Sequence, residues 1–116
     1  MTDCIFCKIA NKEISVEFLY EDDLVIAFKD VRPIAPVHIL IISKKHIESI
    51  ADLEENDEIL AGRLVMAAKN LARKSGIADK GYKLLFRVRE HGGQEVLHIH
   101  LHLIGGARLS ENIRPI

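Results

Sequence analysis

Apolar and polar residues alternate, or apolar residues run on without interruption, in five short stretches of the chain. These stretches are residues 16–22, 24–30, 38–46, 82–88 and 96–104, and they predict five β-strands. Asp22 and Asp23 mark the turn between the first two strands, and Gly92 and Gly93 lie in the loop between the last two. The stretch at 38–46 is apolar enough to be buried on both faces of a sheet.

A longer stretch, residues 52–76, has the spacing of one amphipathic helix. Asp52 and Glu55 resemble a capping box at its start, and Gly76 suits the position after its last turn. The apolar stripe of this helix consists of Ile59, Leu60, Leu64, Val65, Ala68 and Leu71. A short helix is expected at residues 5–12. Five strands with one long and one short helix predict an α+β fold, not an alternating parallel α/β sheet.

The chain contains no internal repeat, low-complexity tract or linker rich in Pro, Gly or Ser, so we expect a single domain over residues 1–116. Lys and Arg number 16 against 17 Asp and Glu, and this balance gives no broad basic face for nucleic acid. A small ligand or a protein partner is favoured. No apolar run approaches the roughly 20 residues that cross a membrane, and the N-terminus lacks the pattern of a signal peptide. A cytoplasmic protein is expected.

Three histidines occupy alternate positions of the last predicted strand. His98, His100 and His102 would share one face, and the apolar residues between them would share the other. On a regular strand the outer two lie about 13 Å apart at Cα. Because zinc–nitrogen bonds are only about 2.0–2.1 Å long, the three rings are not expected to bind one metal ion together.

A lone histidine in a strand is most often a hydrogen-bonded, partly buried ring, but three in register indicate chemistry. Imidazole can act near neutral pH as a nucleophile or as a general acid. Gly92 and Gly93, just before the strand, offer backbone N–H groups that no side chain obstructs, which suits an anion. Histidines beside such a loop indicate a phosphate site.

The segment "HIHLHLI" resembles the signature of the histidine triad family, in which three histidines alternate with apolar residues. The resemblance extends over "CIFCKI", "DVRPIAPVHILIISKKHI" and "GGQEVLHIHLHLIGG", and is closest to the Hint branch of nucleotide-binding proteins. It implies an α+β fold with a five-stranded antiparallel sheet, paired into a homodimer with a continuous sheet. It also implies hydrolysis of purine nucleoside phosphoramidates, such as AMP joined to an amine, through a nucleotidyl-histidine intermediate and without an organic cofactor.

The resemblance assigns roles to four histidines. His100, in the middle of the triad, would be the nucleophile that attacks the α-phosphorus. His102 would contact the phosphate and help the leaving group to depart, and His98 would orient the site. His38 would lie behind the triad as a further hydrogen-bond partner.

The resemblance also implies a nucleotide site. Asp30 would bind the ribose hydroxyls, with Val31 adjoining it. N–H donors around Gly93 and Gln94 would stabilise charge on the phosphate. The apolar base pocket would consist of Ile5, Phe6, Ile9 and Phe28. For each of these four apolar residues, ordinary core packing is the competing interpretation.

Three features depart from the common family pattern. Arg87 stands where Asn is usual; it can still donate to phosphate, but it adds charge and bulk. Glu95 resembles the bacterial branch, and it is either a proton donor to a departing amine or a solvated loop residue. The tail "ARLSENIRPI" lacks the aromatic ending that often shapes the leaving-group pocket, so the leaving group stays undefined.

Cys4 and Cys7 form a C-x-x-C motif that supplies only half of a tetrahedral zinc site. A thioredoxin-like redox role is disfavoured, since that motif follows a strand in a βαβ unit. Some histidine triad relatives bind zinc through this pair and two histidines, which match His46 and His98 here. The resemblance therefore implies a structural zinc, and the alternative is two reduced, half-buried cysteines with a surface His46.

Three functions compete on this sequence. The favoured one is a nucleoside phosphoramidate hydrolase or nucleotidyl transferase. The second is a nucleotide-binding interaction or regulatory protein with little catalytic activity. The third is a metal-dependent hydrolase that uses an H-x-H pair, for which no third ligand is evident on the open face.

Overall fold

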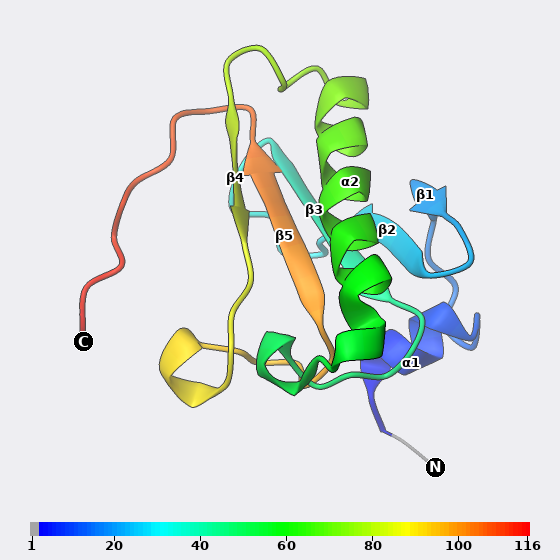
Figure 1. The fold of residues 1–116 in the computed structure, drawn as a ribbon. Coiled ribbons are helices and arrows are strands. Elements are labelled where there is room, and N and C mark those ends of the chain that lie inside the picture. The colour runs from blue at the N-terminus through cyan, green and yellow to red at the C-terminus, as the bar shows by residue number, and fades with distance from the viewer. Residues whose placement is uncertain (1–2) are drawn as a thin grey trace.

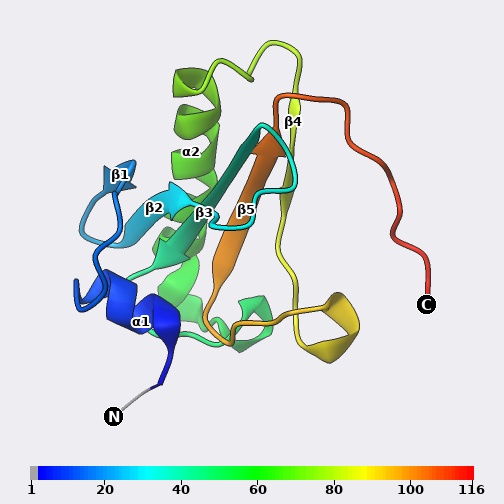
Figure 2. The same cartoon turned by 180° about the vertical axis from the view of Figure 1, so that it is seen from behind.

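The structure, a computed structural model, describes residues 3–116. Its centre is a five-stranded antiparallel sheet with the strand order β1-β2-β3-β5-β4. The strands are β1 (Tyr20–Glu21), β2 (Val25–Lys29), β3 (Val37–Ser43), β4 (Tyr82–Leu85) and β5 (His100–Gly105). The long helix α2 (Glu58–Lys74) lies on one face and the short helix α1 (Ile5–Ala10) on the other (Figure 1, Figure 2). The predicted α+β architecture is confirmed.

Alternation of side chains across the strands produces two apolar layers. On β3, Ile39 and Ile41 face α2 and join one buried cluster, while Leu40 and Ile42 face α1 and join the other. β3 is thus buried on both faces, as its apolar run predicted. On β5, Leu101 and Leu103 belong to the α2 layer, so the residues between them must face the α1 side.

The start of the long helix was predicted six residues too early. Residues 50–57 form two short 3₁₀ turns, Ile50–Asp52 and Glu55–Asp57, before α2 begins at Glu58. Asp52 does not cap with Glu55; its carboxylate accepts a hydrogen bond from the Ser49 hydroxyl at 2.7 Å. Asp57 instead accepts from the backbone N–H of Glu54 at 3.0 Å. Several acidic residues follow one another in this segment, and each could cap a helix, so the sequence alone does not indicate which one does.

Other boundaries also differ from the predicted ones. Gly76 does follow the helix, with φ of 78°, as expected for that position. The stripe residues Ile59 and Val65 are exposed, at 73% and 45%, because only one narrow side of α2 meets the sheet. The first strand shrinks to two residues, and the last begins at His100, not at residue 96, because the chain bends at residues 96–98. A third 3₁₀ turn, Glu90–Gly92, follows β4.

Within residues 3–116, no helix is long and apolar enough to cross a membrane. The C-terminal residues after β5 form an extended tail that leaves the sheet beyond β4 (Figure 1). Lys83 on β4 donates to the backbone carbonyl of Ser110 in that tail at 2.8 Å.

Candidate functional site

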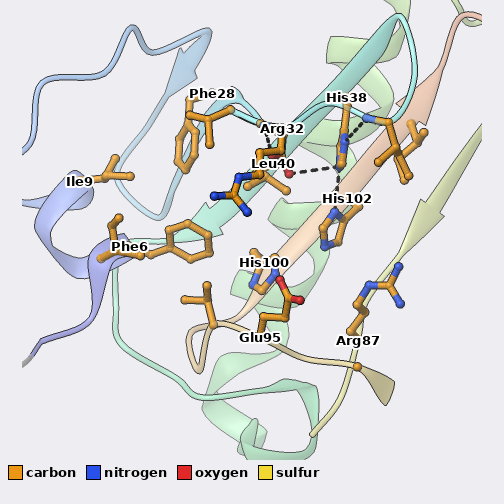
Figure 3. A pocket seen from close by; sticks show the side chains of 17 residues that line it. Phe6, Ile9, Phe28, Arg32, His38, Leu40, Arg87, Glu95, His100 and His102 are labelled. Atoms are coloured by element: carbon orange, nitrogen blue, oxygen red, sulfur yellow. Dashed lines mark hydrogen bonds and ion pairs between the residues drawn. The ribbon is translucent and has the colours of Figure 1, made fainter. Parts of the chain in front are cut away.

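A cavity of about 550 Å³ opens on the α1 side of the sheet. It receives residues from α1, from the C-terminal ends of β2 and the loop after it, and from β3, β5 and the loop before β5 (Figure 3). Its lining residues are Ile5, Phe6, Ile9, Phe28, Asp30, Val31, Arg32, Ile34, His38, Leu40, Arg87, Gly93, Glu95, Val96, His100, His102 and Ile104.

The cavity brings together nearly all residues that the sequence predicted for catalysis and nucleotide binding. Two do not line it. The ring of His98 is fully buried behind the cavity, because the bend before β5 takes it out of register with His100 and His102. Gln94 braces the loop: its side-chain amide accepts from the backbone N–H of Arg89 at 2.8 Å and donates to the Val96 carbonyl at 3.0 Å.

A backbone contact fixes the protonation of His100. Its Nδ1 lies 2.7 Å from the carbonyl oxygen of His98. Because a carbonyl can only accept, Nδ1 carries the hydrogen, and Nε2 keeps its lone pair in the neutral ring. His98 therefore orients the triad through its backbone, while its ring does something else. This arrangement leaves Nε2 of His100 as the available nucleophilic atom on the cavity wall.

A second chain of hydrogen bonds fixes His102. Nδ1 of His38 accepts from the backbone N–H of Ile34 at 3.3 Å, so the hydrogen of His38 is on Nε2. That Nε2–H points at Nδ1 of His102, 3.0 Å away, with a carboxylate oxygen of Asp30 at 3.4 Å. The hydrogen of His102 is therefore on Nε2, an atom that is buried and has no partner among the described residues. The Nε2–H of His102 can therefore donate a hydrogen bond to a ligand in the cavity.

These contacts also argue against a catalytic metal ion at Asp30, His38 and His102, whose donor atoms lie within 4.8 Å of one another. A metal ligand needs a lone pair on the nitrogen that faces the ion, whereas Nε2 of His38 carries a hydrogen directed at His102. The proximity of the three residues is explained by hydrogen bonding alone.

The cavity histidines are neutral near pH 7. Burial, together with the neighbouring His100, His38 and Arg87, lowers the pKa of His102 to about 4, against the opposing charge of Asp30. Burial also lowers the pKa of His38, partly offset by Asp30, and burial lowers that of His100. A neutral imidazole has the free lone pair that a nucleophile needs.

Arg87 and Glu95 stand at the mouth of the cavity (Figure 3). Arg87 follows β4 and does not belong to it, because the strand ends at Leu85. Its guanidinium covers Gly93, where a side-chain carbon would lie 3.5 Å from Nη1. Gly93 has φ of 74°, which favours glycine and turns the loop past the histidines. Glu95 lines the same cavity as His100 (Figure 3).

The other end of the cavity is apolar. The ring of Phe6 packs edge-on against Phe28, with centroids 5.9 Å apart, and against His100 at 5.0 Å. Phe6, Ile9 and Phe28 are buried in the layer beneath α1, and Ile5 is 48% exposed at the rim. Core packing and pocket lining thus coexist in Phe6, Ile9 and Phe28, which belong to this buried layer and also line the cavity.

Comparisons with known proteins agree with this geometry. A family model described as "Scavenger mRNA decapping enzyme C-term binding" matches residues 3–112. The purine nucleoside phosphoramidase of Escherichia coli K12 is 46% identical over 107 residues, which cover 92% of this chain and 90% of that protein. A HIT family hydrolase from Legionella pneumophila has a TM-score of 0.92 at 46% identity, covering 97% of this chain and 100% of that one. A histidine triad protein from Clostridium difficile gives 0.91 at 39%, covering 96% of each.

This chain belongs to the histidine triad family. The resemblance carried by "HIHLHLI" is thereby confirmed, and with it a nucleotide-binding hydrolase as the class of protein. The roles of the individual residues stay predictions.

A second group of functional side chains in this histidine triad chain lies behind the cavity. The cysteine–histidine cluster consists of Cys4, Cys7, His46 and His98, whose ligand atoms all lie within 4.8 Å of one another. The sequence predicted these four residues, and the structure brings them together. His46 is exposed and His98 is fully buried, so the cluster reaches from the surface to the back of the cavity.

The protonation of His98 leaves a lone pair directed into the cluster. Its Nε2 lies 2.7 Å from the Ser43 carbonyl and must donate to it, so Nδ1 carries no hydrogen in the neutral ring. Burial lowers the pKa of His98 to about 4, which keeps the ring neutral. Burial raises the pKa of the Cys7 thiol to about 11, so a thiolate there would need a cation beside it. The cluster can hold a metal ion.

Several cavity residues were not predicted from the sequence: Arg32, Ile34, Leu40, Val96 and Ile104. Strand alternation could have found two of them, since Leu40 shares a face with His38 and Ile104 shares one with His102. Arg32, Ile34 and Val96 lie in loops or bends, where no periodicity assigns a direction to a side chain.

Proposed function

We propose that this protein hydrolyses purine nucleoside phosphoramidates, compounds in which AMP is joined to an amine, through a nucleotidyl intermediate on His100. The observation that carries this proposal is the pair of fixed tautomers on the cavity wall. His100 keeps a lone pair on Nε2, and His102 keeps a hydrogen on its Nε2, which has no hydrogen-bond partner within residues 3–116. A nucleophile and a phosphate donor on adjacent positions of one face suit attack at phosphorus. The E. coli relative, 46% identical, is named a purine nucleoside phosphoramidase.

In the first step, the lone pair on Nε2 of His100 forms a bond to the α-phosphorus while the phosphorus–nitrogen bond to the amine breaks. The departing nitrogen takes up a proton from water at the mouth of the cavity. The Nε2–H of His102 and the N–H groups around Gly93 donate hydrogen bonds to the phosphoryl oxygens, where negative charge grows.

In the second step, water attacks the same phosphorus, gives up one proton to solvent and breaks the bond to His100. AMP leaves and Nε2 regains its lone pair. We propose that Asp30 accepts from the ribose hydroxyls and that the base enters the apolar end beside Phe6 and Phe28. Support for this placement is that the carboxylate and the apolar end both line the cavity that holds His100.

We further propose that the cysteine–histidine cluster binds a structural zinc ion. Four of the separations between its ligand atoms run from 3.1 Å, between His46 Nδ1 and Cys7 Sγ, to 3.5 Å, between His98 Nδ1 and Cys7 Sγ. Tetrahedral zinc with bonds of about 2.0–2.1 Å to nitrogen and 2.3 Å to sulfur requires separations of roughly 3.3–3.8 Å. The observed separations lie within a few tenths of an ångström of what zinc requires, so the residues fit with a small adjustment of the side chains. When bound, zinc cross-links the N-terminal segment to the sheet.

A homodimer is the remaining part of the proposal. Two chains would pair through α2 and the outer edge of β4, which would join their sheets. The support is that β4 is an edge strand with no further strand on its outer side among residues 3–116, and that α2 exposes apolar side chains.

The test is to trap the intermediate. Adenosine phosphoramidate labelled in the adenylate should leave label on His100 after a rapid alkaline quench, located by peptide mapping. His100→Asn removes the nucleophilic nitrogen and should lower turnover by about 10⁴-fold or more while it largely spares folding and AMP binding. His91→Asn, at an exposed histidine that does not line the cavity, is the matched control.

Label on His102, label on no histidine, or a loss of only about tenfold in His100→Asn would contradict the proposed intermediate. The last result would mean that the imidazole of His100 only positions the substrate.

A further inference from the structure

The cysteine–histidine cluster and the cavity share one short helix. Cys4 is the N-cap of α1, and its sulfur accepts from the backbone N–H of Cys7 at 3.4 Å. The two residues between these cysteines, Ile5 and Phe6, both line the cavity. One side of α1 therefore contributes to the cluster, and another side forms the apolar wall where the base is proposed to bind.

Phe6 touches both sites at once. Its ring packs edge-on against His98 of the cluster, with centroids 5.9 Å apart, and against His100 of the cavity at 5.0 Å. A displacement of this ring would change the space beside His100 and the contact with His98 together. Phe6 is 7% exposed, so it has little room to move without the helix.

In the cysteine–histidine cluster, His98 is fixed to the sheet by hydrogen bonds, whereas the two cysteines lie on a short helix. His98 is tied to the sheet: its ring donates to the Ser43 carbonyl at 2.7 Å, and the next residue, Ile99, donates its N–H to the Ile47 carbonyl at 2.7 Å. Cys7 belongs to α1, a helix of only six residues, and Cys4 is the N-cap of that helix. A helix of that length is not stable by itself, so its position depends on side-chain contacts.

We propose that a metal ion bound by Cys4, Cys7, His46 and His98 sets the affinity of the neighbouring cavity for its nucleotide, because it fixes α1 and the ring of Phe6 against the sheet. This inference rests on the proposed nucleotide site and goes beyond a merely structural metal. Without the ion, α1 keeps its apolar contacts, and only hydrogen bonds, such as those of Cys4 Sγ with His98 Nδ1 at 3.3 Å and of Cys7 Sγ with His46 Nδ1 at 3.1 Å, join its cysteines to the two histidines. Part of the nucleotide's binding free energy then has to order the cavity wall.

Coupling of this kind is reciprocal. If the ion strengthens nucleotide binding by some factor, the nucleotide must strengthen binding of the ion by the same factor. Typical couplings between sites correspond to roughly 5–150-fold. We expect the dissociation constant of AMP to rise at least about fivefold when the ion is removed. A metal that only stabilised the fold would leave the affinity of the folded protein unchanged.

The experiment measures AMP binding by calorimetry to the whole protein, loaded with one equivalent of Zn²⁺ and after removal of metal by a chelator. Zn²⁺ affinity is measured by chelator competition with and without saturating AMP. His46→Ala and His46→Cys form the matched pair, since His46 is exposed and does not line the cavity. Alanine deletes a ligand and should weaken AMP binding, whereas cysteine supplies another zinc ligand and should restore it.

AMP affinities that agree within about twofold in the loaded and metal-free folded proteins would overturn this inference, because a twofold difference is well below the expected coupling. The proposed hydrolase activity would be unaffected by that result. Failure of the loaded protein to bind AMP at all would remove the proposed function and this inference with it. If the metal-free protein unfolds, Co²⁺ replaces Zn²⁺, and AMP should shift the absorption bands of the bound Co²⁺. An unchanged spectrum at saturating AMP would then overturn the inference.

Discussion

His100 and His102 lie on one face of β5, yet they present opposite chemistry to the cavity. The difference comes from single contacts: a backbone carbonyl takes the hydrogen of His100 Nδ1, and the Nε2–H of His38 occupies Nδ1 of His102. Each ring is neutral because burial lowers its pKa. The nitrogen that a neighbouring group contacts therefore decides whether each histidine presents a lone pair or a hydrogen to the cavity.

Arg87 is the residue at which this chain departs most from the usual family pattern, and it gives a prediction at the residue scale. Arg87→Asn should weaken AMP binding by about tenfold, roughly 1.4 kcal/mol, because a charged phosphate donor is replaced by a neutral one. Turnover should stay unchanged or improve, since stronger ground-state binding does not by itself accelerate chemistry. Binding is measured by calorimetry and turnover at saturating substrate.

Arg108→Asn, at an exposed arginine outside the cavity, should change neither quantity. The difference between wild type and Arg87→Asn should shrink at high salt, because exposed charges are screened. If Arg87→Asn binds AMP as tightly as wild type at low salt, the guanidinium does not contact the phosphate.

At the scale of elements, the turn between β1 and β2 is tied to α2 through Asp22. Its carboxylate accepts from the backbone N–H groups of Leu24 and Val25 at 2.8 and 2.9 Å, from the Tyr20 hydroxyl and from Arg63 on α2. Burial raises the pKa of Asp22, but these hydrogen bonds outweigh it and hold the pKa well below the usual range. A depressed folded-state pKa makes this carboxylate a source of stability above the unfolded pKa of about 3.9.

Asp22→Asn should therefore lower the free energy of unfolding by about 1–3 kcal/mol near neutral pH, since the charged acceptor is lost while the amide oxygen remains. The difference from wild type should narrow as the pH falls below about 4 towards the folded-state pKa, where the wild-type carboxylate also becomes protonated. Urea unfolding near pH 7 and near pH 3 measures both values.

Asp23→Asn is the matched control for this turn. Asp23 also contacts Arg63, at 3.2 Å, but its side chain is 82% exposed. An exposed pair contributes only about 0–1 kcal/mol, so this variant should change stability little at either pH. Equal losses of unfolding free energy in Asp22→Asn and Asp23→Asn would show that the hydrogen bonds of the buried Asp22 carboxylate add no stability.

Helix α1 gives a second prediction at this scale. Cys4→Ser removes one cluster ligand and the sulfur at the N-cap, so bound zinc should fall from one per chain to a small fraction. Thermal unfolding should shift down by at least about 4 °C, which corresponds to roughly 1 kcal/mol in a domain of this size. Turnover of the folded variant at saturating substrate should fall by a smaller factor than its zinc content does. Metal analysis that finds no zinc in wild type purified without chelators would contradict this prediction.

At the scale of the whole molecule, the exposed face of α2 and the edge of β4 predict a dimer. Ile59, Val65 and Met66 on α2 are 73%, 45% and 50% exposed. Exposed apolar side chains that gather on one helix often mark a protein–protein interface. Sedimentation at micromolar concentration should therefore give twice the mass of the chain. A monomer that retains full activity under these conditions would rule the dimer out.

Introducing a charged residue on that face of α2 tests whether it is the dimer interface. Met66→Asp should shift the protein towards monomer, because an interface buries the new carboxylate without a partner. Lys29→Asp, at an exposed position at the end of β2, should leave the mass unchanged. If Met66→Asp remains fully dimeric, the chains pair through another surface.

The sequence by itself determined the elements whose periodicity is long and uninterrupted. The two-faced burial of β3, the helical run of residues 58–74 and the opposite faces of β5 follow from local spacing, which depends on backbone geometry alone. The glycines near the histidines, the apolar positions at residues 5–9 and the four cluster residues were also recognisable, since their types and order match a family signature. The resemblance alone assigns them to a nucleotide site and a zinc site.

Only the tertiary structure decided that the ring of His98 lies in the cysteine–histidine cluster and does not line the cavity. Local spacing assigned His98 to the same face as His100, but a bend before β5 turns its ring towards Cys4 and Cys7. That bend is held by contacts with residues around position 45, far away in the sequence. The tautomers, the partnerless nitrogen of His102 and the contact of Phe6 with both sites likewise arise between distant segments. No local periodicity can specify them, because each depends on which segments the folded sheet brings together.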